Sequence, residues 1–347
     1  MKKLSNKTIN LMTLAGLLVF YLAVELSSTI PIGADGPLMN GYILRIIVLI
    51  MINVILSVSL NLINGYTGLF SVGHAGFMIV GGYVSGFITT LFFNITKDTP
   101  YWIALPEFML SILLAAVVSA IVGFIIGLPA LRLSDDYLAI VTIGFGEILR
   151  VIFNFITFKK QVGTWMLDIG GPRGLLGIPP LSNFTLVFLF TVMTIIIVRN
   201  FVYSRHGRAC LAIRESEIAA KMMGVNITTY KVLAFVLGST LAGIGGALLA
   251  HLNQMLHPTQ GGFMMSIEFL IIVYLGGMGS ISGTIVAAVL LTGLNELLRP
   301  IGELRMVLYG VLLVVFMLRR PSGLMGNREF MFLIPAKERK RYAAQNT

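Results

Sequence analysis

Long apolar stretches limit what this chain can fold into more than any other feature of its sequence. A helix needs about 20 apolar residues to cross the hydrocarbon core of a membrane. Hydrophobic residues make up 56% of the 347 and charged residues 12%, whereas soluble domains carry about 25% charged residues. These features predict an all-α polytopic membrane protein, because a lipid-facing β-barrel would show short alternating segments instead. Ten helices are predicted, at residues 11–29, 42–63, 75–93, 107–127, 137–157, 183–199, 230–251, 264–276, 281–298 and 304–318.

Two of these stretches leave the count open. The stretch at 264–276 is short enough to be a half-helix, so nine or eleven crossings also agree with the sequence. The stretch at 11–29 follows a basic start, as the apolar part of a signal peptide would. Its apolar part is long, however, and no clear small-x-small cleavage site follows it. We therefore expect this stretch to remain as a transmembrane helix.

The positions of lysine and arginine predict the orientation of the chain, because these residues gather in the cytoplasmic loops of membrane proteins. With ten helices and a cytoplasmic N-terminus, 17 of the 25 basic residues lie inside and five outside. The other three, Arg45, Arg150 and Arg305, fall within helices. Both termini are therefore expected in the cytoplasm. The net charge of +10 is explained by this topology and by contact with the lipid membrane, so no nucleic-acid partner is expected.

The sequence lacks the patterns that would carry catalysis or hold a metal. Cys210 is the single cysteine, which excludes an intrachain disulfide and a cysteine-rich metal site. We find no metal-spaced histidine cluster, paired catalytic acids or nucleophile motif. A P-loop needs a glycine followed by lysine, and no glycine in this chain precedes a lysine. We therefore expect no catalytic residues, no metal and no cofactor bound by this chain.

A polar segment interrupts the apolar runs at residues 204–229. Within it, Ser216 suits a helix start, Gly224 a helix end and Asn226 the cap of the next helix, so a helix is predicted over 217–223. Helices below roughly 12 residues are marginal in water. An apolar face at helical spacing therefore needs a docking surface, either on the same membrane domain or on a cytoplasmic partner. The residues of this face are Ile218, Ala219, Met222 and Met223.

Several stretches, taken in order, carry a family pattern. They are LNLINGYTGLFSVGHAGFMIVGGY (60–83), LPALRLSDDYLAIVTIGFGEILR (128–150), GGPRGLLGIP (170–179), YLGGMGSISGTIVAA (274–288) and RRPSGLMG (319–326). Over residues 42–326 the chain resembles the LivM-type permeases of branched-chain amino acid ABC transporters. The stretch EIAAKMMGVN (217–226) is similar to the coupling segment of ABC importer permeases.

This resemblance implies a permease subunit that imports leucine, isoleucine and valine by alternating access across a bacterial-type inner or plasma membrane. It further implies two ABC ATPase subunits that use the ATP, a homologous second permease and an external solute-binding protein. The expected organisation is an N-terminal helix and external loop (1–41), a permease domain (42–326) with the coupling loop 204–229, and a basic cytoplasmic tail (327–347). The residues expected to couple to the ATPases are Glu215, Ser216, Glu217, Ile218, Ala219, Ala220, Met222, Met223 and Gly224.

Ionisable residues inside membrane helices are unfavourable, so each is a candidate for the translocation path. The candidates are Glu147, Arg150, Glu268 and His74. Glu147 and Arg150 are three residues apart on one helix, which favours a structural ion pair. A histidine such as His74 is more often a hydrogen-bonded packing residue. The Gly-rich stretch 64–76 around it is either a tight cytoplasmic turn or a re-entrant segment.

Two other functions stay open at this level. Related permeases import urea or short amides, so such a substrate is an alternative within the same architecture. An ion- or proton-coupled secondary transporter would need acids arranged along a relay, and Glu147 and Glu268 are few for that purpose. The external loop 158–182 is either a solvated cap or part of a landing surface for a binding protein. Its polar and aromatic residues include Lys159, Lys160, Trp165, Asp168 and Arg173.

Overall fold

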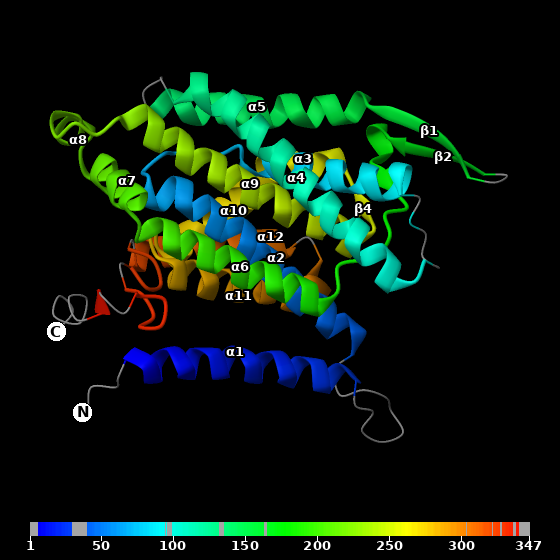
Figure 1. Cartoon of the computed structure of the whole chain (residues 1–347), viewed down its shortest axis with the longest axis horizontal. Helices are drawn as coiled ribbons and strands as arrows, with labels where there is room; N and C mark the ends of the chain where they lie inside the picture. The colour runs from blue at the N-terminus through cyan, green and yellow to red at the C-terminus, as the bar shows by residue number, and fades with distance from the viewer. Residues whose placement is uncertain are drawn as a thin grey trace.

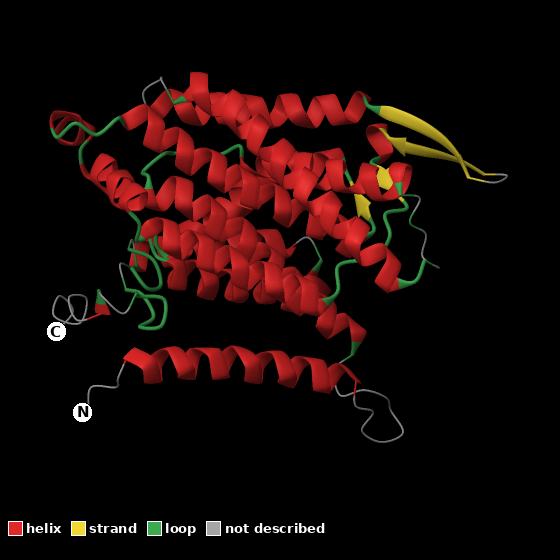
Figure 2. Cartoon of the chain, in the orientation of Figure 1, coloured by secondary structure: helices red, strands yellow, loops and turns green. Residues whose placement is uncertain are grey.

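A computed structural model describes residues 6–29, 40–93, 95, 99–131, 135–162, 165–302, 304–320, 322–326, 328–335 and 338–339. These residues form a bundle of helices with two short antiparallel strand pairs (Figures 1 and 2). The α-helices are α1 (Asn6–Thr29), α2 (Gly41–Asn61), α3 (His74–Phe87), α4 (Tyr101–Ala130), α5 (Asp135–Phe155), α6 (Phe184–Val202), α7 (Arg205–Glu215), α8 (Glu217–Met222), α9 (Ile227–Asn253), α10 (Phe263–Gly276), α11 (Ile281–Leu297) and α12 (Leu304–Arg319).

Shorter elements extend or join these helices. Two π-helical turns, η1 (Leu62–Tyr66) and η2 (Ile88–Phe92), continue α2 and α3. The strands are β1 (Thr157–Val162), β2 (Trp165–Gly170), β3 (Leu175–Leu176) and β4 (Met255–Leu256), paired β1–β2 and β3–β4. The 3₁₀ turns are η3 (Gly171–Arg173), η4 (Pro258–Gly261) and η5 (Arg299–Ile301).

Each of the ten predicted membrane helices coincides with a helix of the structure. The largest difference is at α4, which begins at Tyr101 instead of 107 and runs through Pro106. Pro106 lacks the N–H that would bond the carbonyl oxygen of Trp102, and the helix continues despite the loss of this one hydrogen bond. Among the described residues, six helices are long and apolar enough to cross a membrane, and three apolar helices are shorter. The structure thus confirms an all-α, multi-helix membrane protein.

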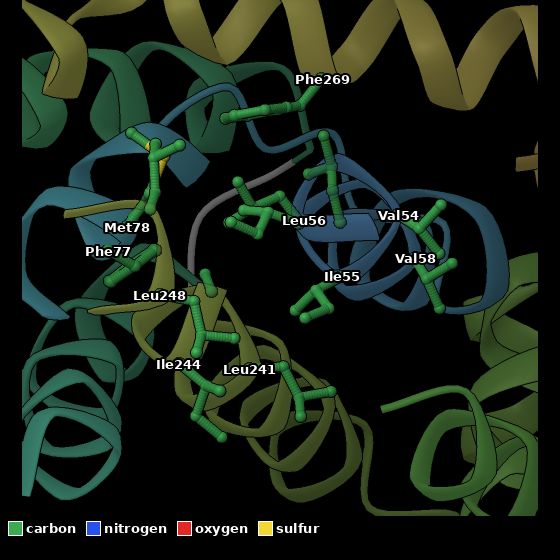
Figure 3. Close-up of a cluster of buried hydrophobic side chains, with 14 of the residues drawn as sticks. Val54, Ile55, Leu56, Val58, Phe77, Met78, Leu241, Ile244, Leu248 and Phe269 are labelled. Atoms are coloured by element: carbon green, nitrogen blue, oxygen red, sulfur yellow. The ribbon is translucent and has the colours of Figure 1, made fainter. Parts of the chain in front are cut away.

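Helix α9 lies at the centre of the bundle and packs against α2, α3 and α4 (Figure 1). Glycines bring its backbone close to its neighbours. A Cβ on Gly246 would lie 1.8 Å from the carbonyl oxygen of Met78, and one on Gly243 would lie 2.2 Å from Ser119 Oγ. Small residues therefore set the distances between the central helices. The apolar side chains gathered around this contact are Val54, Ile55, Leu56, Val58, Phe77, Met78, Leu241, Ile244, Leu248 and Phe269 (Figure 3).

The two ends of the bundle differ in character (Figure 1). Helix α8 lies at one end, together with the start of α1 and the last described residues of the chain. We call this the α8 end. The β1–β2 hairpin projects from the opposite end and replaces the plain loop expected after residue 157. The side chains of Lys159, Lys160, Trp165 and Asp168 in this hairpin lie outside the described part of the structure.

Candidate functional site

The short helix α8 forms where the capping residues predict it. Ser216 Oγ accepts a hydrogen bond from the backbone N–H of Ala219 at 3.3 Å, which satisfies one of the free donors of the first turn. The chain leaves α8 at Gly224, whose φ of +79° is a left-handed conformation that favours glycine. Asn226 Oδ1 then accepts a hydrogen bond from the N–H of Thr229 at 3.2 Å and caps α9. The predicted start, end and following cap of this helix are confirmed.

Two contacts fix α8 to the rest of the chain. The Ala220 side chain is only 4% exposed, so this side of α8 is packed. On α9, Lys231 is 4% exposed and forms an ion pair with Glu217, the first residue of α8. An ammonium group with so little access to water needs this carboxylate partner. The orientation of α8 is therefore set by packing on one side and by a charge pair at its start.

The opposite face of α8 is apolar and exposed. Ile218 is 77% exposed, and Met222 and Met223 are each 84% exposed. We call these three residues, together with the exposed Ala219, the α8 patch. Within the described residues, the patch does not pack on the membrane domain, which was one of the two expectations for it. Glu215 next to it is also exposed and pairs with Arg214 at 2.9 Å.

Arg214, at the end of α7, joins this unit to the end of α2. Its Nη1 donates a hydrogen bond to the carbonyl oxygen of Gly65 in η1 at 2.8 Å. Its side-chain stem packs against Gly68, where an added Cβ would lie 2.7 Å from Arg214 Cγ. The guanidinium also approaches Gly279, in the turn between α10 and α11, whose added Cβ would lie 2.8 Å from Nη1. Sequence reasoning did not single out this arginine, because its partners lie far away in the chain.

Asn61 joins the same two segments from inside the bundle. Its Nδ2 donates to the carbonyl oxygen of Ser280 at 2.9 Å and to Thr284 Oγ1 at 2.8 Å. Its Oδ1 accepts a hydrogen bond from the N–H of Gly279 at 2.9 Å. Since Asn61 is fully buried and uses its donors and its acceptor, this amide fixes the end of α2 against the α10–α11 turn.

The Gly-rich stretch after α2 turns back into the bundle. Within this stretch, the Asn64 side chain donates a hydrogen bond to the carbonyl oxygen of Ser71 at 3.1 Å. His74 then begins α3, is fully buried, and lies with Nε2 2.8 Å from Ser59 Oγ. Ser59 lies about 10 Å of helix rise before Tyr66, the last residue of η1, so His74 contacts α2 well inside its end. This geometry favours the re-entrant interpretation and gives His74 a packing contact.

The starts of α3 and α10 meet beside α5. The backbone N–H of Ala75 donates to Ser266 Oγ on α10 at 3.1 Å. On α5, Glu147 Oε2 pairs with Arg150 Nε at 2.5 Å, and Glu147 Oε1 accepts a hydrogen bond from the N–H of Phe263 at 3.2 Å. The predicted Glu147–Arg150 ion pair is confirmed, and it also caps the start of α10. Glu268 lies on an exposed part of α10.

The chain was compared with known proteins. Residues 42–317 match the family model described as the permease component of branched-chain amino acid transport systems. The LivM permease protein of the high-affinity branched-chain amino acid transport system of Salmonella typhimurium is 36% identical, over 79% of this chain and 68% of the relative. LivM of Escherichia coli K12 is 34% identical, over 80% of this chain and 68% of the relative. LivH of Salmonella typhimurium is 24% identical, over 79% of this chain and 91% of the relative. No solved structure matches the chain.

Proposed function

Since the chain belongs to the family of permease components of branched-chain amino acid transport systems, and is thus a non-catalytic, multi-pass membrane subunit of an ABC transporter, we propose how it works within that system. It imports leucine, isoleucine and valine by alternating access. Two ATPase subunits use the ATP and dock at the α8 end. A homologous second permease completes the path, and an external solute-binding protein delivers the amino acid.

The α8 patch is the observation that supports ATPase docking. We infer that the exposed isoleucine and two methionines of α8 and its C-cap need a partner surface, because exposed apolar groups of this size favour burial. Methionine side chains are flexible and adapt to grooves on other proteins. The packed Ala220 and the Glu217–Lys231 pair hold the patch in one orientation. The coupling residues predicted from the sequence therefore divide into a patch that contacts the partner and a base that positions it.

Arg214 offers the route by which a movement of α8 reaches the membrane helices. It lies in the last turn of α7, two residues before the Ser216 cap, and its guanidinium is bonded to Gly65 in η1, which continues α2. Asn61 continues this connection into the α10–α11 turn. Displacement of α8 by the ATPases would thus shift the ends of α2, α10 and α11 together, which is the type of movement that alternating access requires.

The α8 end faces the cytoplasm in this proposal. The distribution of 17 inside and five outside basic residues supports this orientation, although several of these residues lie outside the described part of the structure. The start of α1 and the last described residues lie at the α8 end (Figure 1). Ten crossings with both termini in the cytoplasm agree with the distribution of basic residues and with the position of the two ends of the chain. The 42–326 permease domain then lies between an added N-terminal helix (1–41) and a cytoplasmic tail (327–347).

The path and the second permease belong on the face that exposes charged groups of α5 and α10. The side chains of Glu147 and Arg150 are 37% and 33% exposed, and Glu268 is exposed as well. Charged groups in membrane helices are unfavourable against lipid and face protein or water-filled cavities instead. We therefore assign these three residues to the permease–permease face, beside the path. His74 is buried and orders the re-entrant segment that borders it.

Uptake measurements on the complete transporter test this function. The chain is purified with its partners from native membrane, reconstituted in liposomes, and assayed for ATP-dependent uptake of labelled leucine. We expect unlabelled leucine, isoleucine and valine to compete and urea to have no effect. Competition by urea would assign a different substrate class. Uptake by the single chain without ATP would instead favour a secondary transporter.

The α8 patch is tested on the same purified complex, by measuring ATPase retention. The double variant Ile218→Ala/Met222→Ala should weaken ATPase retention at least about tenfold, which corresponds to roughly 1.4 kcal/mol of lost binding energy. Leu113→Ala is the matched control, because Leu113 is 60% exposed on α4 but lies in a membrane helix. Retention that is unchanged in the double variant would contradict the assignment of the patch.

A further inference from the structure

The chain continues after α12 as a segment that packs on the α8 end. We define the C-terminal strap as residues 322–326, 328–335 and 338–339, the described residues of this segment. The N–H of Leu324 donates to the carbonyl oxygen of Leu275 at 2.7 Å. Further along, Leu333 and Ile334 are 5% and 1% exposed. The strap is therefore packed structure, although the sequence predicted only a basic tail for the residues after 326.

Glu329 of the strap holds the start of α11. Its Oε1 accepts a hydrogen bond from the N–H of Ile281 at 2.6 Å, and its Oε2 accepts one from the N–H of Ser282 at 3.0 Å. The Ser282 hydroxyl also donates to Oε2. A carboxylate at the first two residues of a helix satisfies free backbone donors and faces the positive end of the helix dipole. Glu329 thus fixes the α10–α11 hairpin at the turn.

The same carboxylate also binds the end of α2. Tyr66, the last residue of η1, donates its hydroxyl to Glu329 Oε1 at 3.0 Å. Tyr66 directly follows Gly65, whose carbonyl oxygen accepts the Arg214 hydrogen bond. One carboxylate therefore joins α11 to the segment of α2 that the α7–α8 unit contacts. This junction is not a necessary part of a helix cap, because the two backbone amides alone would complete the cap.

The other end of the strap is attached to α6 and α7. Arg199 Nε on α6 donates to the carbonyl oxygen of Leu333 at 2.5 Å. Arg208 on α7 lies 3.8 Å from a carboxylate oxygen of Glu338. The strap thus runs from the start of α11 to the helices that carry α8.

A cavity of about 220 Å³ lies between the strap and the α7 helix. Its polar lining includes Tyr66, Tyr203, Arg208, Arg214, Glu329 and Glu338. The strap and α7 are therefore not closely packed at this point. The polar contacts around the cavity join the two segments instead.

We propose that Glu329 is a positioning residue that transmits ATPase-driven movement of α7–α8 to α11, through its joint contact with Tyr66 and the first turn of that helix. This inference rests on the proposed docking of the ATPases at α8. It adds a second connection from the end of α2 to α11, parallel to that of Asn61, and it assigns a role in transport to the C-terminal segment. The first turn of α11 then follows the end of α2 whenever the coupling unit moves.

The test uses the complete transporter in liposomes and measures leucine uptake and ATP hydrolysis together. Tyr66→Phe removes the junction to α2 but leaves the backbone cap of α11 intact. We expect this variant to reduce the uptake per ATP hydrolysed about fivefold or more, with unchanged ATPase retention and unchanged thermal stability. Glu329→Gln should also lower this ratio and, because it weakens the α11 cap, should lower thermal stability as well. Glu329→Asp should restore part of the ratio because it keeps the charge.

A carboxylate at the other end of α11 provides the matched control. Glu296 pairs with Arg299 at 2.8 Å, so Glu296→Gln changes a carboxylate of the same helix away from the strap and should leave the ratio unchanged. A normal ratio in Tyr66→Phe would overturn the proposal. So would a Glu329→Gln variant whose only change is lower thermal stability, since Glu329 would then be a helix cap alone. Failure of the unmutated chain to retain ATPases would instead refute the proposed docking itself.

Discussion

The guanidinium of Arg214 donates a hydrogen bond to the carbonyl oxygen of Gly65 across 2.8 Å, and this contact joins the last turn of α7 to the end of α2. The two residues are far apart in sequence and lie at the end of the bundle that carries α8. Gly68 lets the arginine stem lie against the backbone of the Gly-rich segment that follows η1. The hydrogen bond therefore connects the segment that carries the α8 patch directly to the end of a membrane helix.

Replacing Arg214 tests this link. Arg214→Ala should reduce ATP-dependent uptake about fivefold or more, the lower end of typical coupling effects, while the ATPases stay bound. Arg214→Lys should be intermediate, since it keeps a charge and a stem but loses the planar group. Arg205→Ala on the exposed start of α7 serves as the control. Full uptake in the alanine variant would show that Arg214 does not transmit the movement.

Substitutions at Gly224 test the geometry after α8. Gly224 has φ of +79°, whereas proline fixes φ near −65° and removes the N–H that donates to Lys221 at 3.0 Å. Gly224→Pro should therefore abolish most coupled uptake while leaving the protein in the membrane. Gly224→Asn should be tolerated, because asparagine adopts the left-handed conformation and an added Cβ meets nothing within 4 Å. Equal uptake by both variants would contradict this account.

Ala220 tests the packed side of α8 independently. Ala220→Asp places a carboxylate at a position that is 4% exposed, where an unpaired charge is strongly disfavoured. We expect α8 to lose its packing against the rest of the chain, so that ATP hydrolysis and uptake become uncoupled. Ala219→Asp on the adjacent exposed position should keep α8 seated and act only on ATPase binding. Limited proteolysis near residue 220 distinguishes these results, since only the first variant should become sensitive.

The ion pair between Glu217 and Lys231 should show strong coupling in a double-mutant cycle. Glu217→Gln removes the carboxylate that pairs with the ammonium of Lys231, which is 4% exposed. We expect the packing of α8 against α9 to lose roughly 1–2 kcal/mol of stability. The loss is smaller than for a fully buried pair because the Glu217 side chain is partly solvated. Adding Lys231→Met removes the buried charge and should restore most of the loss. If the two substitutions had additive effects on hydrogen exchange in α8, the ion pair would not stabilise this helix.

Cys210 is expected to resist alkylation in the folded protein. It is buried on α7, and burial raises the pKa of its thiol to about 11. The reactive thiolate is therefore scarce near pH 7.5. Because this pKa is above the ordinary value for a thiol, the neutral form is the one the fold favours, and that preference is lost as pH rises through about 11. Maleimide should react with Cys210 slowly before denaturation and readily after it.

The sequence predicted the local features of this molecule better than its long-range contacts. Ser216, Gly224 and Asn226 act within a few residues of their partners, so their types and spacing were enough to place α8. Glu147 and Arg150 are likewise neighbours on one helix. The roles of Arg214 and Glu329 depend on Gly65 and Ile281, which only the folded bundle brings close. No pattern along the chain marks such pairs, and the β1–β2 hairpin was missed because its sequence reads as a plain loop.

Site-directed cross-linking from the α8 patch tests whether the ATPases dock on α8. Cys210 is the single native cysteine and is buried, so Met222→Cys introduces one reactive thiol at an 84% exposed position. The thiol is labelled with a photo-activated cross-linker in native membranes, and the adduct is identified by mass spectrometry. We expect an adduct with an ABC ATPase subunit. Recovery of the chain without an ATPase adduct, from a complex that still contains both ATPases, would contradict the assignment of α8 as their docking helix.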